Sequence, residues 1–264
     1  MKPKPQRLLM NMMMAVDDRI VHVRDAIRAC ELFDVSSNST RVALARLSAD
    51  GLIESCGRGQ YQLTDKAHRL ADDLRGWRTA LERLVPWSGR WLAVHCGDLG
   101  RSDKPVLRRR TRALQMNGFQ ELSRDLFVRP DNLAGSTDAI RQRLYRLGLE
   151  PEAPVFALSE LDSRRQQVAR TLWDRDTLET GYQRTTERLH RWLDKAKDLE
   201  PEIAARESFE IGDEAIRQIV FDPLLPDAMV DQQARQRFFD TLLEHDQVGH
   251  SIWQRLYHEA QSQG

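Results

Sequence analysis

The N-terminal fold is decided by one stretch, Val35-Ser36-Ser37-Asn38-Ser39-Thr40-Arg41-Val42-Ala43-Leu44-Ala45-Arg46-Leu47-Ser48-Ala49-Asp50-Gly51-Leu52-Ile53. It predicts a turn, then a helix, then the first strand of a hairpin. Ser36 or Ser37 can cap the helix, because a hydroxyl accepts hydrogen bonds from the N–H groups that a first helical turn leaves unpaired. Gly51 follows the helix, where a positive φ costs little for glycine. A narrow apolar face is predicted to pack inward, and it consists of Val42, Leu44 and Leu47 with the small Ala43.

Five polar residues of this helix are left to face outward: Ser37, Asn38, Thr40, Arg41 and Arg46. A helix that enters a DNA major groove needs short donors and acceptors near its first turn, with cations for phosphates or guanine edges. An ordinary amphipathic helix with a polar cap gives the same pattern. The helix alone therefore leaves both interpretations open.

The overall composition neither requires nor excludes contact with DNA. The chain has 264 residues, of which 41% are hydrophobic, and its formal net charge is +0. This length predicts one large domain or two to three small ones. A role in DNA binding must rest on local charge, and the only charges between positions 38 and 47 are two arginines.

Three cysteines, Cys30, Cys56 and Cys96, lie far apart in the sequence. Their odd number and wide spacing predict neither a disulfide framework nor a metal knuckle, and they fit a reducing cytoplasm. No histidine set has the spacing of a zinc site, so neither a metal nor a cofactor is predicted. No apolar run approaches the roughly 18 residues of a membrane span. The sequence predicts a cytoplasmic location.

The flanking sequence completes a helix-turn-helix with a wing. Helices are predicted over residues 5–14 and from Asp17 or Asp18 to about Phe33, and a tight turn leads into the quoted helix. Two short runs after that helix flank Gly57-Arg58-Gly59, which predicts a β-hairpin. Arg58 at its tip could contact a phosphate or enter the minor groove. Residues 1–66 are thus predicted to form a winged helix-turn-helix DNA-binding domain.

The rest of the chain predicts three further parts, and the fold class is α+β. Residues 67–86 are expected to form a connector helix that Pro86 ends. Residues 87–160 alternate strand, helix, strand pair, helix and strand, which is the split βαβ pattern of a ferredoxin-like domain. Residues 161–264 are predicted to form a mostly helical C-terminal domain, with helices over about 174–199 and 208–221, a rigid turn at 222–226 and a helix pair over about 231–260.

Motifs in four parts of the chain resemble those of the PaaX-type transcriptional repressors, in the same order. They are the stretch Ser36–Leu52 with Gly57-Arg58-Gly59-Gln60-Tyr61-Gln62-Leu63-Thr64; Trp87-Ser88-Gly89-Arg90-Trp91; Asn117-Gly118-Phe119 with Leu126-Phe127-Val128-Arg129-Pro130; and Asp222-Pro223-Leu224-Leu225-Pro226. Each motif is modest by itself. Their order and spacing over most of the chain make the resemblance fairly specific.

The resemblance implies a homodimeric bacterial transcription regulator of the phenylacetate-degradation type, usually a repressor and not an enzyme. It implies a Cas2-like fold for the ferredoxin-like middle domain. It also implies an effector, phenylacetyl-CoA or another acyl-CoA, that releases the protein from double-stranded operator DNA. No effector-contact motif is matched in this sequence, so the ligand-binding residues stay open.

The DNA-binding interpretation predicts which residues contact bases and which contact phosphates. Asn38, Thr40 and Arg41 are expected to reach bases, while Ser37, Arg46 and Arg58 mostly hold phosphates. The resemblance to the PaaX-type repressors implies that a dimer occupies the operator. An acyl-CoA would then shift the two reading heads to a spacing that no longer matches successive major grooves.

Other interpretations stay open at this stage. Asp98 follows the first strand of the middle domain, where Cas2-type nucleases use an aspartate, although a single carboxylate is thin support for a metal-dependent nuclease. The winged helix could instead bind protein. The basic run Arg108-Arg109-Arg110 with Arg112 could bind the phosphates of CoA or additional DNA, or it could be one solvated helix face. Aromatic residues of the C-terminal half could line a pocket for an aromatic acyl group or simply form core.

Overall fold

The chain folds into two compact units in its computed structural model, which describes residues 4–15, 20–68 and 76–262. Unit 1 comprises Met1–Trp77, Arg188–Glu214 and Thr241–Gly264, and unit 2 comprises Arg78–Glu187 and Ala215–Asp240. Both units combine helices with an antiparallel sheet, which confirms the predicted α+β class. Within the described residues, no helix is long and apolar enough to cross a membrane.

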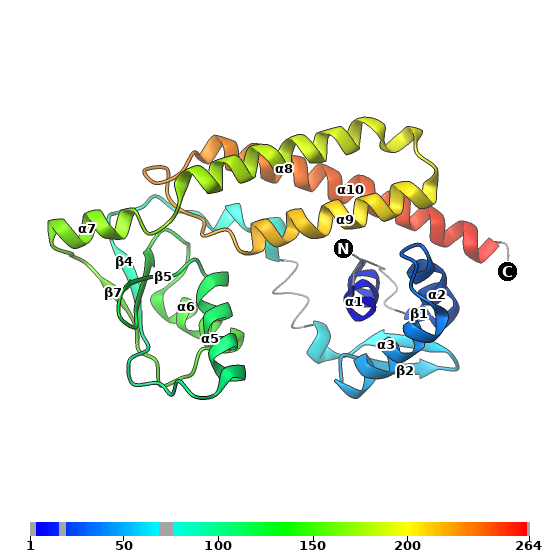
Figure 1. Ribbon diagram of the computed structural model, residues 1–264, viewed down its shortest axis with the longest axis horizontal. Coiled ribbons are helices and arrows are strands. Elements are labelled where there is room, and N and C mark those ends of the chain that lie inside the picture. Colours follow the sequence, from blue (N-terminus) through cyan, green and yellow to red (C-terminus); the bar gives the residue numbers. More distant parts are fainter. Residues whose placement is uncertain (1–3, 16–19, 69–75, 263–264) are drawn as a thin grey trace. The chain divides into compact units, whose positions relative to one another are not determined.

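The N-terminal segment of unit 1 combines helices with a small sheet (Figure 1). The helices are α1 (Pro5–Ala15), α2 (Val23–Glu31) and α3 (Ser37–Ala49), and the strands are β1 (Ile20–His22), β2 (Ile53–Gly57) and β3 (Gln60–Leu63). The strand order is β1-β3-β2, and both pairings are antiparallel. The predicted first helix and the predicted hairpin are confirmed.

The predicted start of the second helix is wrong. Ile20–His22 form a strand that pairs with β3, and α2 begins only at Val23. The proposed caps Asp17 and Asp18 lie outside the described residues. The pairing of β1 depends on a partner some 40 positions away (Ile20 opposite Gln62), so the local helical pattern could not reveal it.

Helix α3 forms where the sequence predicts it, but its buried face is shifted. Ser36 caps the helix by accepting a hydrogen bond from the Ser39 backbone N–H at 3.2 Å, and Gly51 takes a positive φ of 66° just after it. Ala43, Leu44 and Leu47 are buried as expected. Val42, which was expected to point inward, is instead 43% exposed. Thr40, which was expected to face outward, points inward and has no exposed surface. The buried positions therefore follow the i, i+3, i+4, i+7 spacing of one helix face.

Replacing Ser36 with alanine is expected to lower the free energy of unfolding by about 1 kcal/mol, because the first turn of α3 loses its side-chain cap. Urea denaturation of the full-length chain measures the change. Ser48→Ala is the matched control, since Ser48 is an exposed serine in the last turn of the same helix. Equal stability of the two variants would show that the cap contributes nothing.

Three long helices form the C-terminal part of the chain: α8 (Arg175–Lys195), α9 (Pro201–Val220) and α10 (Gln232–Ser262). Each of them has one segment in unit 1 and another in unit 2. The predicted helix pair over residues 231–260 is wrong, because α10 runs through this region without a break. The helix predicted from about 208 begins earlier, at Pro201, where proline suits the first turn.

The C-terminal segments of unit 1 share the core of the N-terminal helices. Phe209 of α9 and Trp253 of α10 pack against the buried cluster formed by α1, α2, α3 and the small sheet. Arg7 of α1 also pairs with Asp213 of α9 at 2.5 Å. Unit 1 is therefore built from both ends of the chain.

His245 is a buried histidine in α10 of unit 1, only 2% exposed. Its ring lies 4.5 Å from that of Trp192, and its Nε2 has no hydrogen-bond partner among the described residues. Burial disfavours the charged imidazolium and lowers the pKa of His245 to about 4. The ring is therefore neutral in the folded chain at neutral pH.

The stability of unit 1 is expected to fall as the pH drops from about 6.5 to about 4. In this window an unfolded chain binds a proton at His245 that the folded chain resists, and the loss amounts to at most about 3 kcal/mol. The measurement is urea denaturation at several pH values for His245→Leu and for the control His250→Leu in the same helix. Only His245→Leu should flatten the pH dependence, and equal slopes would contradict this account.

The predicted connector helix does not continue to Pro86. The chain is helical from Asp65 to His68, residues 69–75 lie outside the described residues, and two short 3-10 helices follow, η1 (Gly76–Thr79) and η2 (Leu81–Arg83). Leu84 then forms an isolated bridge with Leu133. The α-helical prediction is therefore wrong over residues 76–84.

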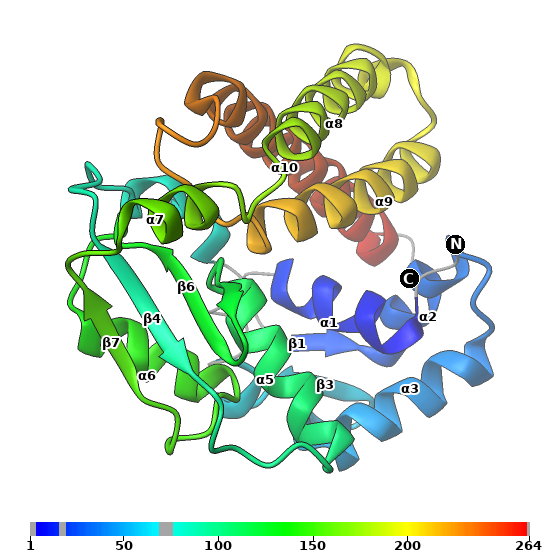
Figure 2. The ribbon, with the colours of Figure 1, turned by 60° about the vertical axis from the view of Figure 1, so that its left-hand side comes forward.

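Unit 2 contains a four-stranded antiparallel sheet with helices α5 and α6 beside it (Figure 2). Along the chain the elements are β4 (Trp91–His95), α5 (Lys104–Met116), β5 (Gln120–Ser123), β6 (Leu126–Pro130), α6 (Thr137–Leu147), β7 (Val155–Leu158) and α7 (Ser163–Arg170). The strand order is β5-β6-β4-β7. The alternation of strands and helices predicted for residues 87–160 is confirmed.

A buried polar network anchors the turn that links α9 and α10 in unit 2. The Tyr182 hydroxyl donates to Asp222 Oδ2 at 2.6 Å, and the Leu224 backbone N–H donates to Asp222 Oδ1 at 2.7 Å. Asn132 in turn donates to the Leu224 carbonyl at 2.7 Å. Asp222 and Arg235 are both almost fully buried, with their charged atoms 3.9 Å apart. Burial raises the pKa of Asp222, and the Arg235 charge opposes that shift.

Candidate nucleic-acid interface

The first turn of α3 presents polar side chains to solvent. Asn38 is exposed, and its side chain makes no hydrogen bond with the part of the chain that the structure describes. Arg41 is exposed one turn further along, and its guanidinium donates to the Ser37 hydroxyl at 2.7 Å. This bond holds the cation beside the N-terminal turn of the helix. The arrangement offers an amide and a guanidinium, the two groups that bind adenine and guanine edges in pairs of hydrogen bonds.

Thr40 does not belong to this exposed surface. Its side chain is fully buried, and its hydroxyl donates to the Ser36 carbonyl at 3.2 Å. It also lies beside the Cys30 thiol, whose pKa is raised chiefly by burial. The prediction that Thr40 faces outward and reaches bases is wrong, because this position completes the packed face of the helix.

Arg46 and Arg58 are both exposed, as the sequence predicted. Arg46 lies in the last turn of α3, about 12 Å further along the helix axis than Asn38 at 1.5 Å per residue. Arg58 lies in the two-residue turn between β2 and β3, where Gly59 has a positive φ of 69°. The cations are thus distributed between the helix and the hairpin tip.

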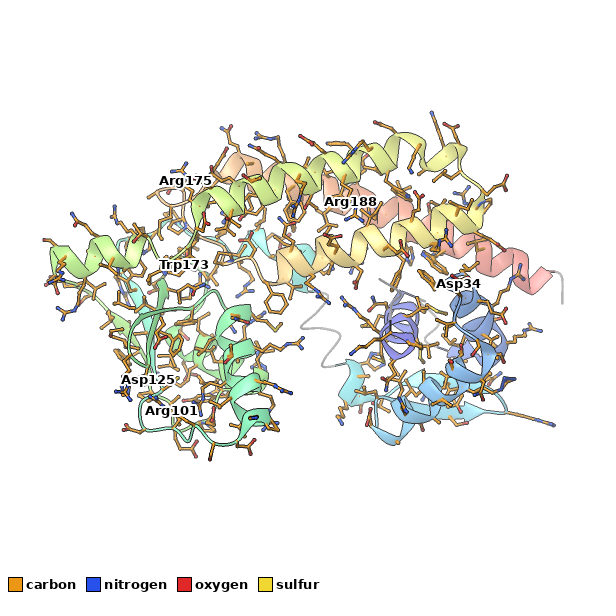
Figure 3. All side chains as sticks on the ribbon, viewed as in Figure 1. Asp34, Arg101, Asp125, Trp173, Arg175 and Arg188 are labelled. Carbon is orange, nitrogen blue, oxygen red and sulfur yellow. The ribbon has the colours of Figure 1, made fainter. Side chains whose placement is uncertain are left out.

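The turn before α3 is tight and strongly anchored. Asp34, labelled in Figure 3, lies in this turn with a positive φ of 55°. The Val35 backbone N–H donates to the Cys30 carbonyl at 3.1 Å. Phe33, which precedes the turn, contacts two aromatic rings of the C-terminal helices. Its ring lies 5.1 Å from Phe209 edge-on and 6.5 Å from Trp253 in a stacked arrangement. The position of α3 therefore depends on α9 and α10.

These aromatic contacts were not expected from the sequence. The aromatic residues of the C-terminal half were noted as core or pocket candidates, but nothing in their spacing connects Trp253 to Phe33. Trp253 also borders a small cavity of about 30 Å³ between α2, α9 and α10. That volume is enough for about one water molecule.

Other sequence candidates are dispersed. Asp98 is exposed in the turn after β4, and the described residues contain no group of three or more His, Cys, Asp or Glu side chains that could hold a metal ion. Arg110 is buried and ion-paired with Glu150 at 2.5 Å, so it is not part of an exposed basic face. Burial raises the pKa of the Cys96 thiol to about 11, which makes it a poor nucleophile. The N-terminal part of α3 and the hairpin tip remain the candidate site.

Comparisons with known proteins cover both ends of the chain. Residues 13–67 match the family described as PaaX-like protein, and residues 173–255 match the PaaX-like protein C-terminal domain. No curated protein matches the chain.

The fold is shared with a solved structure. It is that of the uncharacterized protein Rv0674 from Mycobacterium tuberculosis, with a TM-score of 0.58 and 18% sequence identity. The match covers 96% of this chain and 100% of that one. At this identity the likeness speaks for the fold alone.

Proposed function

The chain belongs to the PaaX-like family, whose members are generally transcriptional regulators and typically not enzymes, and from this premise we propose that it is a sequence-specific DNA-binding repressor. Its targets would be genes of aromatic catabolism of the phenylacetate type. It binds double-stranded operator DNA as a homodimer in the cytoplasm. The observation that carries the proposal is the exposed N-terminal part of α3, whose first two turns offer Asn38 and Arg41 next to a tight, anchored turn.

We assign unit 1 the role of reading head. Helices α2 and α3 with the β2–β3 hairpin support a winged helix-turn-helix within residues 1–66, with α3 as the recognition helix. Asn38 and Arg41 contact bases in the major groove. Ser37, Arg46 and the wing residue Arg58 contact phosphates. Thr40 is left out of this surface because it is buried.

The sheet of unit 2 supports a ferredoxin-like, Cas2-like domain over residues 87–160. Its order β5-β6-β4-β7 places the first and third strands of the βαββαβ series at the centre, with every neighbouring pair antiparallel. Residues 67–86 connect this domain to the reading head, and residues 161–264 form the helical C-terminal domain. A homodimer gives two reading heads for a two-fold symmetric operator.

An acyl-CoA, phenylacetyl-CoA first among the candidates, is the proposed effector. The helices α9 and α10 support a route for its action, because their unit 1 segments hold Phe33 at the turn that precedes α3. A ligand that changes the position of these helices would change the position of the recognition helix. Differential affinity of the ligand for the two arrangements would shift the protein between DNA-binding and released states.

The alternative functions have weaker support. A nuclease in the Cas2-like domain would rest on Asp98, an exposed loop carboxylate without neighbouring metal ligands among the described residues. A protein-binding winged helix would not need Asn38 and Arg41 to be displayed together at one helix end.

The test is enrichment of fragments of the source genome by the purified full-length chain, followed by titration of the enriched duplex and a scrambled duplex. The proposal predicts that the enriched fragments share one sequence motif and are bound at least about 1,000-fold more tightly than scrambled DNA. The affinity should fall as the salt concentration rises. Addition of phenylacetyl-CoA should release the complex, whereas free CoA should not. Equal affinity for both duplexes would overturn the proposal.

A further inference from the structure

Helix α5 of unit 2 is strongly basic. Its sequence, Lys-Pro-Val-Leu-Arg-Arg-Arg-Thr-Arg-Ala-Leu-Gln-Met, contains five cations and no acidic residue. The whole chain, by contrast, has 40 basic and 40 acidic residues. A local excess of this size in a neutral chain is therefore a property of this helix and not of the average composition.

The structure separates these five cations by their contacts. Arg110 points inward, where it pairs with Glu150 and donates to the Gly100 carbonyl at 2.9 Å. Lys104, Arg108, Arg109 and Arg112 are all exposed. None of these four takes part in an ion pair within 4.0 Å in the ranges that the structure describes.

Two cations near α5 are already neutralised by ion pairs. Arg101, which precedes α5, pairs with Asp125 (Figure 3). Arg141 of the adjacent helix α6 pairs with Asp138 at 2.7 Å. Four exposed cations without an ion pair among the described residues lie together on α5, and Arg146 is exposed on the adjacent α6. We call Lys104, Arg108 and Arg112 with the flanking Arg109 the α5 stripe.

The spacing of the α5 stripe is regular. Lys104, Arg108 and Arg112 are separated by four residues each, so they lie on one side of the helix at steps of about 6 Å along its axis. Thr111 and Gln115, which are also exposed on α5, add polar groups. A straight, open row of cations fits an extended polyanion, whereas a small phosphate ligand is normally held by donors that converge on one point.

We propose that the α5 stripe binds the phosphate backbone of duplex DNA independently of its sequence, as a second DNA contact outside the reading head. The proposal rests on the proposed function in one respect, since that function supplies DNA as the partner. Each phosphate neutralised by a lysine or arginine releases counterions, so such a contact steepens the salt dependence of binding by about 0.9 per phosphate. It adds affinity equally to operator and non-operator DNA.

The test compares the double variant Arg108→Gln/Arg112→Gln with wild type on a 60-base-pair operator duplex and a scrambled duplex of equal length. The control is Arg164→Gln/Arg184→Gln, which removes two exposed arginines from α7 and α8 of the same unit and changes the net charge equally. The plot of log affinity against log salt concentration should be shallower by about 2 for the α5 variant, per bound protomer. Its affinity should fall by the same factor on both duplexes. The control should keep the wild-type slope.

The outcomes separate this inference from the proposed function. If wild type does not discriminate the operator from scrambled DNA, the proposed function fails. If wild type discriminates and the α5 variant keeps the wild-type slope, the α5 stripe does not bind DNA. The second arm is a titration of wild type and the α5 variant with inorganic pyrophosphate. If the α5 variant loses pyrophosphate binding but keeps the wild-type salt dependence of DNA binding, the α5 stripe binds a small phosphate ligand instead. Circular dichroism of each variant shows whether it is folded. If the double variant is unfolded, the single variants Arg108→Gln and Arg112→Gln replace it, and each should change the slope by about 1.

Discussion

Replacing Arg41 with alanine is expected to weaken operator binding by about 5- to 150-fold, which corresponds to about 1–3 kcal/mol for the loss of a paired contact to a base. The physical reason is the position of the guanidinium. It is exposed one turn beyond Asn38 in α3, and its bond to the Ser37 hydroxyl holds it beside the first turn. The measurement is a fluorescence anisotropy titration with operator DNA and with duplexes carrying single base-pair changes. The variant should lose discrimination at one position of each half-site.

The wing residue gives a contrasting result. Arg58→Ala should weaken binding to operator and scrambled DNA by similar factors and make the salt dependence shallower by about 1, as expected for a phosphate contact. Arg206→Ala is the control for both variants, because Arg206 is an exposed arginine on α9 of the same unit. If Arg41→Ala and Arg58→Ala both bind operator DNA like wild type, the assignment of these residues is wrong.

Replacing Asp222 with alanine should reduce the free energy of unfolding of unit 2 by about 3–5 kcal/mol, which is typical of breaking a buried ion pair by removing one partner. The substitution leaves the Tyr182 hydroxyl and the Leu224 backbone N–H without their acceptor, and it leaves the buried Arg235 cation without its nearby carboxylate. The Leu224 carbonyl also accepts a hydrogen bond from Asn132, which follows β6. The substitution is therefore expected to weaken the contact between this turn and the segment after β6 as well. Urea denaturation followed by circular dichroism measures it.

Two further variants make this result specific to the network. Asp222→Asn keeps an oxygen acceptor of nearly the same shape and should recover part of the loss. Asp227→Ala removes an exposed carboxylate from the same turn and should change stability by less than about 0.5 kcal/mol. Equal effects of Asp222→Ala and Asp227→Ala would show that the buried network does not stabilise the fold.

Local signals explain which parts of α3 and its surroundings could be predicted. Ser36 and Gly51 mark the helix ends through interactions within a few residues, and both predictions are confirmed. The prediction of the buried helix face was wrong at two positions, because Thr40 is buried and Val42 is exposed. Hydrophobicity favoured Val42, but the phase of the helix is set by what packs against Ala43, Leu44 and Leu47, and this cannot be seen in the helix itself.

Long-range contacts explain what the sequence could not reveal. Strand β1 exists because β3 is present as its partner, so a short run following Asp17 and Asp18 was misassigned to a helix. Phe33 contacts Trp253 across 220 positions of sequence, and Asn132 contacts Leu224 across 92. The Asp222 turn carried a motif, yet its hydrogen bonds to other elements followed only from the structure.

The candidate site was predictable in its location and partly in its residues. Asn38, Arg41, Arg46 and Arg58 lie exposed where the pattern placed them, and Thr40 does not. The separation of Arg110 from its basic neighbours was not predictable, because it depends on Glu150, 40 positions away.

Site-directed DNA cleavage from residue 38 tests most directly the claim that the first turn of α3 reads DNA. An iron–EDTA probe is attached to Asn38→Cys in a Cys56→Ser background, since Cys56 is exposed whereas Cys30 and Cys96 are buried. A probe on Ser251→Cys, an exposed position on α10 in unit 1, is the control. We expect the probe at residue 38 to cut both strands at discrete positions facing the major groove of each operator half-site, and the control probe not to cut there. A bound complex in which the two probes give the same pattern, or in which residue 38 produces no localised cleavage, would contradict the account.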